Sequence, residues 1–378
     1  MNHVAVIGLG RIGLPTALVL EKSGFQVIGI DTDESRLNAI KTKALHIDEP
    51  DIRSLFKASK ISVSNQPTAA DIFLICVPTP LTQEKKADLS HLQSAIAMIQ
   101  PFLTKENLVI IESTCPIGTT DEIASHFPGV YFAYCPERVM PGKLLKELIE
   151  CDRTIGGVDQ KATEKAIEFY SRFCRGSLHK TQAKMAEAVK LAENAYRDVN
   201  VALANELSMF ARRIGLSDQE LIALANCHPR VDILKPGPGV GGHCIPIDPE
   251  FLIEAFPKET TLLQAARVVN EQKRIWVEEE IEKGIRQHRC QTIALFGLTY
   301  KANISDFRHS PALAIYENLK EKYHVIPIDP FYPEGVPIQN GIKQAEMVVG
   351  LVAHDAFRVL DKNSLNGKII LDYAEVFG

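Results

Sequence analysis

The glycine-rich segment at residues 237–249, GPGVGGHCIPIDP, places one thiol where the backbone can approach a ligand closely. The glycines and prolines before Cys244 make an ordered loop costly in entropy, so a functional reason for the loop is expected. Cys244 is therefore a candidate nucleophile, and Asp248 could lie beside it if a helix begins near Pro246. A buried, inert cysteine in a flexible turn is the alternative. No metal site is expected, because His243 and Cys244 are adjacent and no second ligand pair follows at ligand spacing.

A second glycine motif lies near the N-terminus, where Gly8-x-Gly10-x-x-Gly13 follows the apolar run 4–7 and opens a helix-compatible segment. Asp31 ends a second strand-like run, 18 residues after Gly13. In this context the glycines permit a tight turn and bring a pyrophosphate close to the N–H groups of the helix N-terminus. Asp31 would accept hydrogen bonds from the adenosine ribose and repel a 2′-phosphate. The motif therefore predicts an NAD site.

Three polar side chains, Lys190, Asn194 and Arg197, recur at i, i+4 and i+7 in a helix-compatible stretch, so they would share one helix face. A solvated polar stripe explains this spacing equally well when it is taken alone. The stretch from residue 183 to 214 contains neither proline nor glycine, which predicts one helix of about 30 residues, long enough to link two domains and offer a dimer surface.

Two polar turns follow apolar runs and could place chemistry at the edge of a sheet. One contains Thr114, after a strand-like run, and the other contains Glu137. The carboxyl ends of strands in an open α/β sheet are where ligands bind. Each segment could equally be an ordinary turn. Cys115 and Cys135 are rival candidate nucleophiles, although neither has the glycine-rich approach of Cys244.

The elements that must position these residues alternate between strand and helix patterns, which predicts parallel sheets. Apolar runs at 26–31, 72–77 and 108–112 continue the opening pattern. A run at 292–297 resembles the first strand, and a run at 324–329 resembles the second and again ends in an acid. The glycine fingerprint is absent from the repeat. The predicted fold class is α/β, with two Rossmann-like doubly wound domains joined by a long central helix. Domain boundaries are expected at 1–180, 181–280 and 281–378.

Composition excludes several classes of protein. Among 378 residues, 42 are basic and 47 acidic, a net charge of -5 that argues against nucleic acid as a partner. No apolar run approaches the ~20 residues of a membrane span, and the N-terminus lacks the basic start of a signal peptide. Eight scattered cysteines without a CxxC pair favour neither a zinc site nor a disulfide framework. We therefore expect a cytoplasmic protein with reduced thiols and no membrane partner.

Seven segments, taken in order, resemble those of the UDP-glucose/GDP-mannose dehydrogenase family. They are GLGRIGLP, CVPTP, ESTCPIGTT, AYCPERVMPG, KLAENAYRDVN, GPGVGGHCIPIDP and GLTYKANISDFRHSP. Within the family, the segments LHIDEP (45–50) and NCHPRV (226–231) resemble the branch that acts on UDP-N-acetyl-D-mannosamine. So does PERVMPG, where the UDP-glucose branch usually carries a sequence like PEFLREG.

The resemblance implies a four-electron oxidation of a C6 hydroxyl to a carboxylate with two NAD⁺. Cys244 would trap the intermediate aldehyde as a thiohemiacetal and then carry the thioester. Lys190 and Asn194 would stabilise the oxyanion. Asp248 and Thr114 would position water, with Asp248 also assisting proton transfer in the alcohol step. In the same comparison, Glu137 resembles the acid that assists thioester hydrolysis.

The family match also implies binding residues and partners. The cofactor contacts would be Gly8, Gly10, Arg11, Ile12, Gly13, Asp31, Pro78, Thr79, Thr114 and Arg308. The UDP-sugar contacts would be Glu137, Arg138, Val139, Lys190, Asn194, Arg197, Arg230, Gly239, Gly241, Gly242 and Lys301. Arg230 would reach the substrate across a homodimer interface. The three domains would then bind NAD, carry the long helix and catalytic loop, and bind the UDP-sugar.

Three positions depart from the family pattern, and alternatives stay open. Arg11 replaces an aromatic or aliphatic residue, Tyr300-Lys301-Ala302 replaces the commoner Phe-Lys-Pro, and His309 stands where many relatives carry Glu. UDP-N-acetylglucosamine and UDP-glucose are alternative substrates. Two-electron β-hydroxyacid dehydrogenases share the N-terminal fold but need no cysteine, so Cys244 disfavours them. A catalytically silent NAD-binding protein is the alternative from another class.

Overall fold

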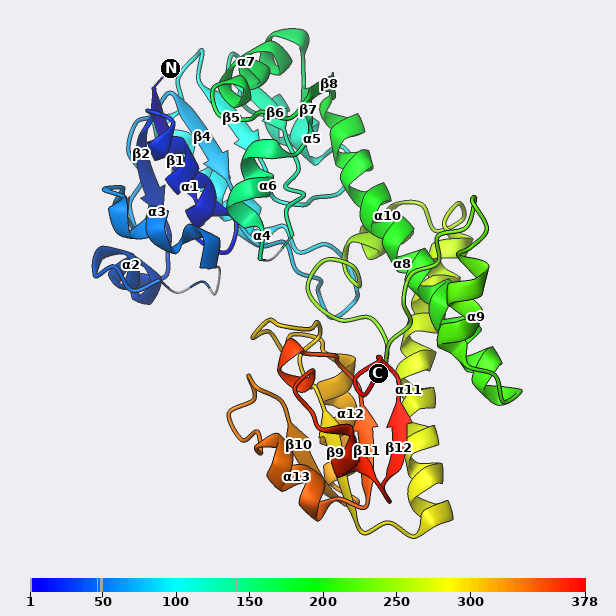
Figure 1. The fold of residues 1–378 in the computed structure, drawn as a ribbon. Helices are drawn as coiled ribbons and strands as arrows, with labels where there is room; N and C mark the ends of the chain where they lie inside the picture. Colours follow the sequence, from blue (N-terminus) through cyan, green and yellow to red (C-terminus); the bar gives the residue numbers. More distant parts are fainter. Residues whose placement is uncertain (1, 46, 48–49, 141) are drawn as a thin grey trace. The chain divides into compact units, whose positions relative to one another are not determined.

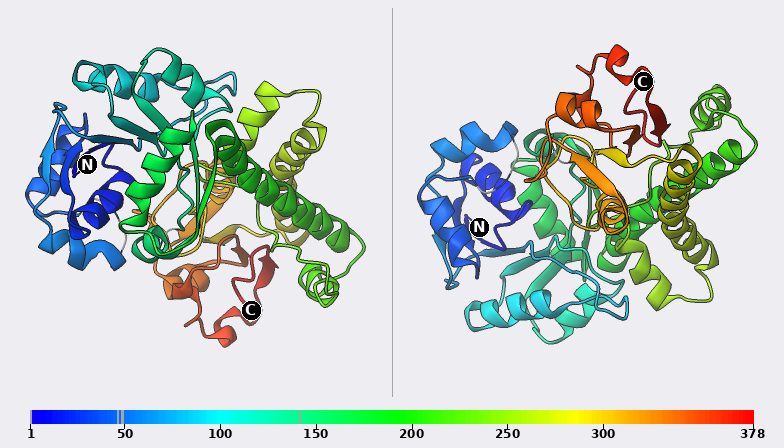
Figure 2. Two further views of the ribbon diagram at one scale, coloured as in Figure 1. Left: turned by 90° about the horizontal axis from the view of Figure 1, so that it is seen from above. Right: turned by 90° about the horizontal axis from the view of Figure 1, so that it is seen from below.

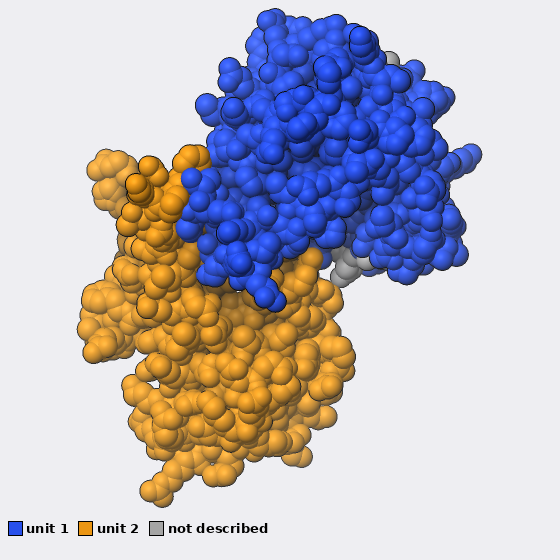
Figure 3. Space-filling view, turned by 180° about the vertical axis from the view of Figure 1, so that it is seen from behind, with its two compact units in different colours: residues 1–193, 250–255 blue, residues 194–249, 256–378 orange. Residues whose placement is uncertain are grey.

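The computed structural model describes residues 2–45, 47, 50–140 and 142–378. His46, Asp48 and Glu49 of the LHIDEP segment, and Pro141 of PERVMPG, lie outside the described residues. The chain divides into two compact units (Figure 3). Unit 1 comprises Met1–Glu193 and Glu250–Ala255, and unit 2 comprises Asn194–Pro249 and Phe256–Gly378.

Unit 1 is built on an eight-stranded sheet with the order β3-β2-β1-β4-β5-β6-β7-β8 (Figure 1). The strands are β1 (His3–Ile7), β2 (Gln26–Ile30), β3 (Ser62–Ser64), β4 (Ile72–Ile75), β5 (Leu108–Ile111), β6 (Tyr131–Tyr134), β7 (Arg153–Gly157) and β8 (Leu178–Gln182). Strand order reverses between β1 and β4, as in a doubly wound sheet. The carboxyl ends of β1, β4, β5 and β6 therefore meet at one edge.

Helices cover both faces of this sheet. They are α1 (Gly13–Lys22), α2 (Glu34–Lys41), α3 (Arg53–Ala58), α4 (Ser90–Ile99), α5 (Thr119–Ser125), α6 (Leu144–Glu150) and α7 (Gln160–Ser171), with short 3₁₀ turns at Pro50–Ile52 and Gln100–Phe102. Because side chains alternate along a strand, Val4 and Val6 pack with Leu18 of α1, whereas Ala5 and Ile7 pack with Ile96 of α4. Two apolar layers thus enclose the sheet.

One strand pair departs from the expected parallel arrangement. β6 and β7 are antiparallel, with Ala133 opposite Gly157. The chain leaves β6 and enters β7 at the same edge of the sheet, because an antiparallel neighbour needs no crossover to the other edge. The start of β7 therefore lies at the edge where β4, β5 and β6 end. The buried charge of Arg153 is placed there for this reason.

Two long helices dominate the middle of the chain (Figure 1; Figure 2). α8 (Ala183–Arg213) has 31 residues, about 46 Å at 1.5 Å per residue, and confirms the helix predicted over 183–214. α9 (Asp218–Ala225) and α10 (Asp248–Ala255) follow. α11 (Thr261–His288) has 28 residues and was not predicted from the sequence.

The C-terminal part of unit 2 is a parallel four-stranded sheet with the order β10-β9-β11-β12. Its strands are β9 (Thr292–Phe296), β10 (His324–Ile328), β11 (Met347–Gly350) and β12 (Ile369–Asp372); α12 (Pro311–Lys320) and α13 (Ile338–Gln344) complete it, with 3₁₀ turns at Asp355–Phe357 and Lys362–Leu365. Leu295 packs with Ile281 of α11 on one face, and Phe296 belongs to the cluster of Ile342 of α13 on the other. The predicted repeat of the opening pattern is confirmed.

Two further findings bear on the chemistry. Within the described ranges, no helix combines the length and hydropathy needed to cross a bilayer. All eight cysteines fall in those ranges and are thiols rather than disulfides.

Candidate active site

The N-terminal glycine turn of unit 1 is shaped for a dinucleotide. A Cβ on Gly13 would lie 1.8 Å from the carbonyl oxygen of Gly8, so only glycine lets α1 begin this close to the turn. A Cβ on Gly10 would meet no atom within 4 Å, so the space in front of that residue is open. Arg11 and Ile12 lead directly into α1, whose N-terminus has no side-chain cap from Ile12. This open cradle at a helix N-terminus fits a pyrophosphate.

Asp31 lies next to this turn, immediately after β2. Its Oδ2 accepts the N–H of Leu9 at 2.7 Å and pairs with Arg36 at 2.7 Å, while Oδ1 accepts the N–H of Asp33 at 2.9 Å. The carboxylate is buried at the point where a dinucleotide would place its adenosine ribose. The structure thus brings Gly8, Gly10, Gly13 and Asp31 together at one edge of the sheet, as the sequence predicts.

Two neighbouring turns extend this edge. The N–H of Val77 donates to Ser113 Oγ at 2.8 Å, which places the segment of Pro78 and Thr79 beside Thr114. Glu187 of α8 holds the segment after Thr114 in place. No role for Glu187 was predicted from the sequence. Its buried carboxylate accepts the N–H of Gly118 at 2.5 Å and both the N–H (2.8 Å) and the hydroxyl (2.6 Å) of Thr120. The helix that carries Lys190 is thereby fastened to the turn that carries Thr114.

Glu137 and Lys190 meet within unit 1. Lys190 Nζ donates to the backbone carbonyl of Glu137 at 2.7 Å, and the Glu137 carboxylate accepts the N–H of Val139. Burial raises the pKa of Glu137 above its ordinary value, although the nearby positive charge of Lys190 opposes that effect. A carboxyl group whose pKa is raised in this way is suited to exchanging protons with a reacting group.

Arg138 is directed elsewhere. Its guanidinium forms a two-pronged ion pair with Glu193 of α8, at 3.1 Å from Nε and 2.5 Å from Nη2. It also donates to the carbonyl of Asp152 at 3.3 Å. In this structure Arg138 therefore fastens the Glu137 turn to α8.

Beneath this edge lies a buried polar cluster that the sequence did not single out. Glu112 accepts the hydroxyl of Tyr170 at 2.7 Å and the thiol of Cys76 at 3.3 Å, and lies 3.7 Å from the guanidinium of Arg153. Arg153 in turn contacts Cys135 Sγ at 3.8 Å. A buried charge without its partner destabilises the fold, so Glu112 and Arg153 must stay together. Their contacts therefore hold the ends of the strands that carry them.

The rival cysteines have environments that keep them protonated. Burial raises the pKa of Cys135 to about 11. Burial, followed by the charge of Glu187, raises the pKa of Cys115 well above its ordinary value. Since the thiolate is the nucleophile, neither residue is suited to attack a carbonyl.

In unit 2, the Cys244 turn places an acid directly after the thiol. The Cys244 carbonyl accepts the N–H groups of Ile247 (3.1 Å) and Asp248 (2.9 Å), and α10 begins at Asp248. The helix that was expected to begin near Pro246 begins at Asp248, whose N–H is bonded back to the Cys244 carbonyl. Asn194 Nδ2 donates to Asp248 Oδ2 at 2.5 Å, and both side chains are buried. Asn194 of α8 is thus bonded to the acid that begins α10, and the backbone turn at Cys244 leads directly into that helix.

The Cys244 loop packs against the loop that follows β9, at residues 297–310. The N–H of Gly242 donates to the carbonyl of Arg308 at 3.1 Å, and a Cβ on Gly241 would lie 2.5 Å from the carbonyl oxygen of His309. His309, which departs from the family pattern, adopts a positive φ of 50° here. Glycine at 241 is therefore required by close approach of two backbones.

Arg308 is held beside the thiol. Its guanidinium forms a two-pronged ion pair with buried Asp306, at 2.9 Å from Nε and 2.6 Å from Nη2. These hydrogen bonds, and after them the charge of the Asp306 carboxylate, raise the pKa of Arg308. The guanidinium therefore keeps a positive charge in the neighbourhood of Cys244. Sequence reasoning assigned Arg308 to the cofactor and did not identify Asp306.

The start of the glycine-rich loop is anchored to the long helices. The N–H of Gly237 donates to Asn205 of α8 at 3.0 Å, and Asn205 donates to Asn270 of α11 at 2.9 Å. Asn270 and Arg267 both donate to buried Asp198, at 2.8 and 2.7 Å. The motif KLAENAYRDVN contains Asp198, but only the unpredicted helix α11 supplies its partners.

The other predicted substrate residues are at the surface of unit 2. Arg197 is exposed on α8, and Arg230 is exposed in the segment after α9. Lys301 is exposed in the loop after β9, and Gly239 lies between the anchored start of the glycine-rich loop and Gly241. None of these positions shares the Asn194–Asp248 hydrogen bond.

The fold of unit 1 and its glycine turn define a dehydrogenase that uses a nicotinamide dinucleotide. The chain belongs to the UDP-glucose/GDP-mannose dehydrogenase family: residues 2–174 match its NAD-binding domain, residues 184–272 its central domain and residues 294–378 its UDP-binding domain.

Relatives of known type are similar over nearly the whole chain. A UDP-N-acetyl-D-mannosamine dehydrogenase of Methanocaldococcus jannaschii is 46% identical, over 98% of this chain and 92% of its own. An NDP-N-acetyl-D-galactosaminuronic acid dehydrogenase of Ralstonia nicotianae is 41% identical, over 98% and 95%. The solved UDP-D-ManNAc dehydrogenase of Pyrococcus horikoshii superposes with a TM-score of 0.94 at 36% identity, covering 99% of this chain and 96% of that one.

Proposed function

We propose that this protein oxidises the C6 hydroxyl of UDP-N-acetyl-D-mannosamine to a carboxylate, with two NAD⁺ consumed per sugar, to supply precursors for surface polysaccharide. The observation that carries the proposal is the turn that sets Cys244 four residues before Asp248, with Asn194 bonded to that acid at 2.5 Å. A two-electron dehydrogenase needs no thiol at this position, whereas retention of an aldehyde between two oxidations does.

Asp31 supports NAD rather than NADP as the cofactor. Its buried carboxylate would oppose a 2′-phosphate at the ribose, and Gly8, Gly10 and Gly13 leave the cradle for the pyrophosphate. Thr114, Pro78 and Thr79 line the neighbouring strand ends of the same unit. NAD⁺, when bound, supplies the chemistry of a hydride acceptor.

The chain's own residues would act in order on the sugar. In the first oxidation, Asp248 assists removal of the hydroxyl proton as hydride leaves C6, which gives the aldehyde. The Cys244 sulfur then adds to the aldehyde carbon, forming a C–S bond and an alkoxide. Lys190 and Asn194 supply N–H donors for that negative charge. Loss of a second hydride from the same carbon leaves a thioester on Cys244.

Hydrolysis completes the reaction. Water adds to the thioester carbon, the C–S bond breaks, and the products are the carboxylate and the regenerated thiol. Thr114 and Asp248 would position the water, and Glu137, whose pKa is raised by burial, would accept its proton. Lys190 would thus contribute in two ways. Its hydrogen bond to the Glu137 carbonyl would position that acid, and its positive charge would stabilise the oxyanion.

The same proposal assigns roles to three regions of the chain. Residues 1–180 would bind NAD, residues 181–280 would carry the long helices and the catalytic loop, and residues 281–378 would bind the UDP-sugar through Lys301. Arg197, Gly239, Gly241 and Gly242 would line the sugar and its diphosphate.

A homodimer is part of the proposal, with Arg230 reaching the partner's substrate. Tyr196, Leu203 and Phe210 recur every seventh residue on α8 and are between 48% and 63% exposed. Such a stripe of large apolar side chains supports pairing with a second helix. A reduced, cytoplasmic setting is proposed because an oxidised Cys244 could not add to the aldehyde.

The experiment that tests the mechanism is the substitution Cys244→Ser. Uronate formation should fall by at least about a thousandfold, because the thioester cannot form, while NAD binding by calorimetry stays unchanged. Cys227→Ser is the matched control, since Cys227 is exposed and lies outside the catalytic loop. Steady uronate production by Cys244→Ser would falsify the thioester route.

A substrate panel tests the choice of sugar. UDP-N-acetylmannosamine, UDP-N-acetylglucosamine and UDP-glucose are compared by the NADH formed per sugar consumed. Two NADH on UDP-N-acetylmannosamine, with at least about tenfold lower kcat/KM on the others, is the expected result. One NADH per sugar would rule out the four-electron reaction, and preference for another sugar would replace the substrate.

A further inference from the structure

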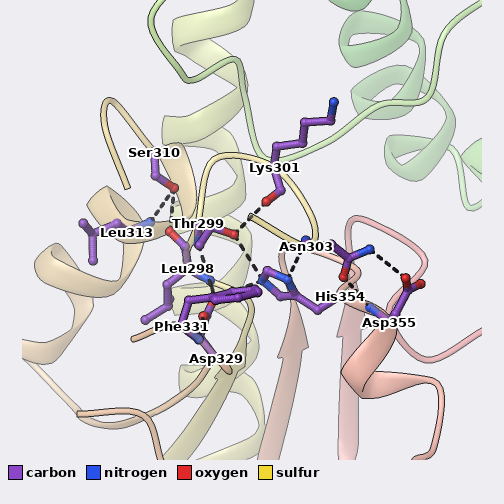
Figure 4. Close-up of polar contacts among 10 residues, drawn as sticks. All are labelled: Leu298, Thr299, Lys301, Asn303, Ser310, Leu313, Asp329, Phe331, His354 and Asp355. Carbon is purple, nitrogen blue, oxygen red and sulfur yellow. Dashed lines mark hydrogen bonds and ion pairs between the residues drawn. The ribbon is translucent and has the colours of Figure 1, made fainter. Parts of the chain in front are cut away.

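A buried histidine of unit 2 lies at the centre of a hydrogen-bond cluster beneath the loop after β9 (Figure 4). His354 follows β11 and is 1% exposed. Its Nε2 lies 3.0 Å from Asp329 Oδ2 and 3.1 Å from Thr299 Oγ1, and its Nδ1 accepts the N–H of Asn303 at 2.9 Å. Every nitrogen of the ring is therefore engaged, and two of the three partners belong to the same loop.

The contacts determine which nitrogen carries the proton. A backbone N–H can only donate, so Nδ1 of His354 must present a lone pair to Asn303. The proton is therefore on Nε2, where it is shared between the carboxylate of Asp329 and the hydroxyl oxygen of Thr299. This arrangement requires a neutral imidazole, since a proton on Nδ1 would face the N–H of Asn303.

The cluster continues from His354 to Lys301. With its oxygen accepting from His354, the Thr299 hydroxyl donates its own hydrogen to the carbonyl of Lys301 at 2.9 Å. Figure 4 shows the ammonium end of Lys301 pointing away from the cluster while its backbone carbonyl faces Thr299. The backbone of Lys301 is thus held from below, and the side chain is presented on the other side of the loop.

Further contacts fix the middle and the base of the same loop. Asn303, which adopts a positive φ of 63°, exchanges two hydrogen bonds with Asp355, at 2.8 and 2.9 Å. Ser310 closes the base of the loop by donating to the carbonyl of Leu298 at 2.7 Å. The charged groups around the imidazole are thus Asp329 after β10, Asp355 beside Asn303, and Lys301 on the loop itself.

We propose that His354 is a positioning residue for the UDP-binding loop, acting through Asn303 and Thr299 to set the backbone of Lys301. The inference rests on the proposed role of Lys301 in binding the UDP-sugar. His354 itself is buried, and its contribution is to hold the loop at Thr299 and Asn303 in one conformation. Loss of its acceptor nitrogen would release Asn303, and loss of its donor would leave the Asp329 carboxylate without its side-chain partner.

Two substitutions separate these roles. In His354→Asn the side-chain oxygen can take the place of Nδ1 and still accept from Asn303. In His354→Gln the longer amide can take the place of Nε2 and still donate to Asp329, but nothing accepts the N–H of Asn303. His324→Asn is the matched control, because His324 is exposed and begins β10 at the opposite edge of the same sheet.

The probe is UDP itself, titrated by calorimetry into each full-length variant alongside NAD. His354→Gln should weaken UDP binding about tenfold, which corresponds to roughly 1.4 kcal/mol, with NAD binding unchanged. His354→Asn should restore most of that loss, and His324→Asn should match the wild type. Equal weakening by Asn and Gln, or equal weakening of UDP and NAD, would overturn the positioning role, as would unchanged UDP binding in both variants.

Failure of the proposed function gives a different result. If the wild type binds UDP but forms no uronate from any UDP-sugar, the proposed reaction is wrong and the UDP titration still decides the role of His354. If kinetics can be measured, His354→Gln should raise the KM for the UDP-sugar and leave kcat and the KM for NAD unchanged. A purely structural defect would instead lower the melting temperature equally in Asn and Gln variants without this split.

Discussion

The first loop of unit 1 and the loop after β9 in unit 2 use the same device for different ends. In each, an acid after the second strand accepts the N–H of the second loop residue: Asp31 from Leu9 at 2.7 Å, and Asp329 from Leu298 at 2.6 Å. The first residue of each loop is also held in the same way. The N–H of Gly8 donates to the carbonyl of Ile30 at 2.8 Å, and the N–H of Gly297 donates to that of Ile328 at 2.9 Å.

The difference lies in how the rest of each loop is held. The first spans five residues, 8–12, and passes directly into α1, whereas the second spans fourteen, 297–310, before α12 begins. Asp31 has an exchangeable partner, the partly exposed Arg36, while Asp329 is closed off by buried His354. The conformation of the short loop depends on its glycines, whereas that of the long loop depends on side-chain hydrogen bonds. The same strand-end acid thus closes a short glycine turn in one unit and a long loop in the other.

The largest effect should come from adding a methyl group to the short loop. Gly13→Ala places a Cβ 1.8 Å from Gly8 O, so the turn must move, NAD binding should be lost, and overpacking of about 1–3 kcal/mol should lower the melting temperature. Gly10→Ala meets no protein atom and should keep the melting temperature while weakening NAD binding. Calorimetry with NAD and thermal unfolding measure both; equal melting temperatures would contradict the contrast.

The two acids should separate the two ligands. Asp31→Asn is expected to raise the KM for NAD roughly tenfold or more and to improve use of NADP, because one charged acceptor is lost. Asp329→Asn is expected to raise the KM for the UDP-sugar by a similar factor and leave NAD unchanged. Steady-state kinetics with each substrate varied in turn provide the measurement. If Asp329→Asn altered the NAD kinetics instead, the division between the loops would not hold.

A smaller effect concerns acid stability. Burial would raise the pKa of Asp329, but hydrogen bonds from His354, Leu298 and Phe331 outweigh it and lower the pKa below its ordinary value. A depressed carboxyl pKa stabilises the fold above the unfolded value of about 3.9 and loses that contribution as pH falls through the folded pKa. The melting temperatures of wild type and Asp329→Asn should therefore differ at neutral pH and converge below about pH 4. A constant difference down to pH 3 would argue against this.

The sequence was sufficient to predict much of the fold because its signals are local. The glycine turn, the strand ending in Asp31, the helix over 183–214 and the repeat near 324–329 each depend on neighbouring residues. The start of α10 soon after Pro246 was predictable for the same reason. α11 was missed although it is 28 residues long, because its buried residues include Asn270 and Lys273 and leave little apolar contrast.

The supporting residues could not be predicted, because their meaning lies in long-range partners. Glu112, Glu187, Asp306 and His354 are single polar residues with no motif of their own. Each becomes informative only when the strand order brings it to a backbone far away in sequence, as His354 meets Asn303 across 51 residues. The antiparallel pairing of β7 with β6 could not be predicted either, because the spacing of apolar residues in a strand does not depend on the direction of its neighbour. Of these supporting positions, the sequence indicated only the acids at strand ends, such as Asp329.

The path of the chain through α10 has a consequence for how the protein is made. Unit 1 includes Glu250–Ala255. Glu250 forms an ion pair with Lys85 at 3.5 Å, and Glu254 accepts the N–H of Ala87 at 3.2 Å. On the ribosome, these acids emerge only after residues 194–249 have been added, a wait of roughly 3–11 s at ~5–20 residues per second. Until then the segment around Ala87 lacks its native acceptors. The N-terminal unit, although begun first, is completed only when two-thirds of the chain has been synthesised.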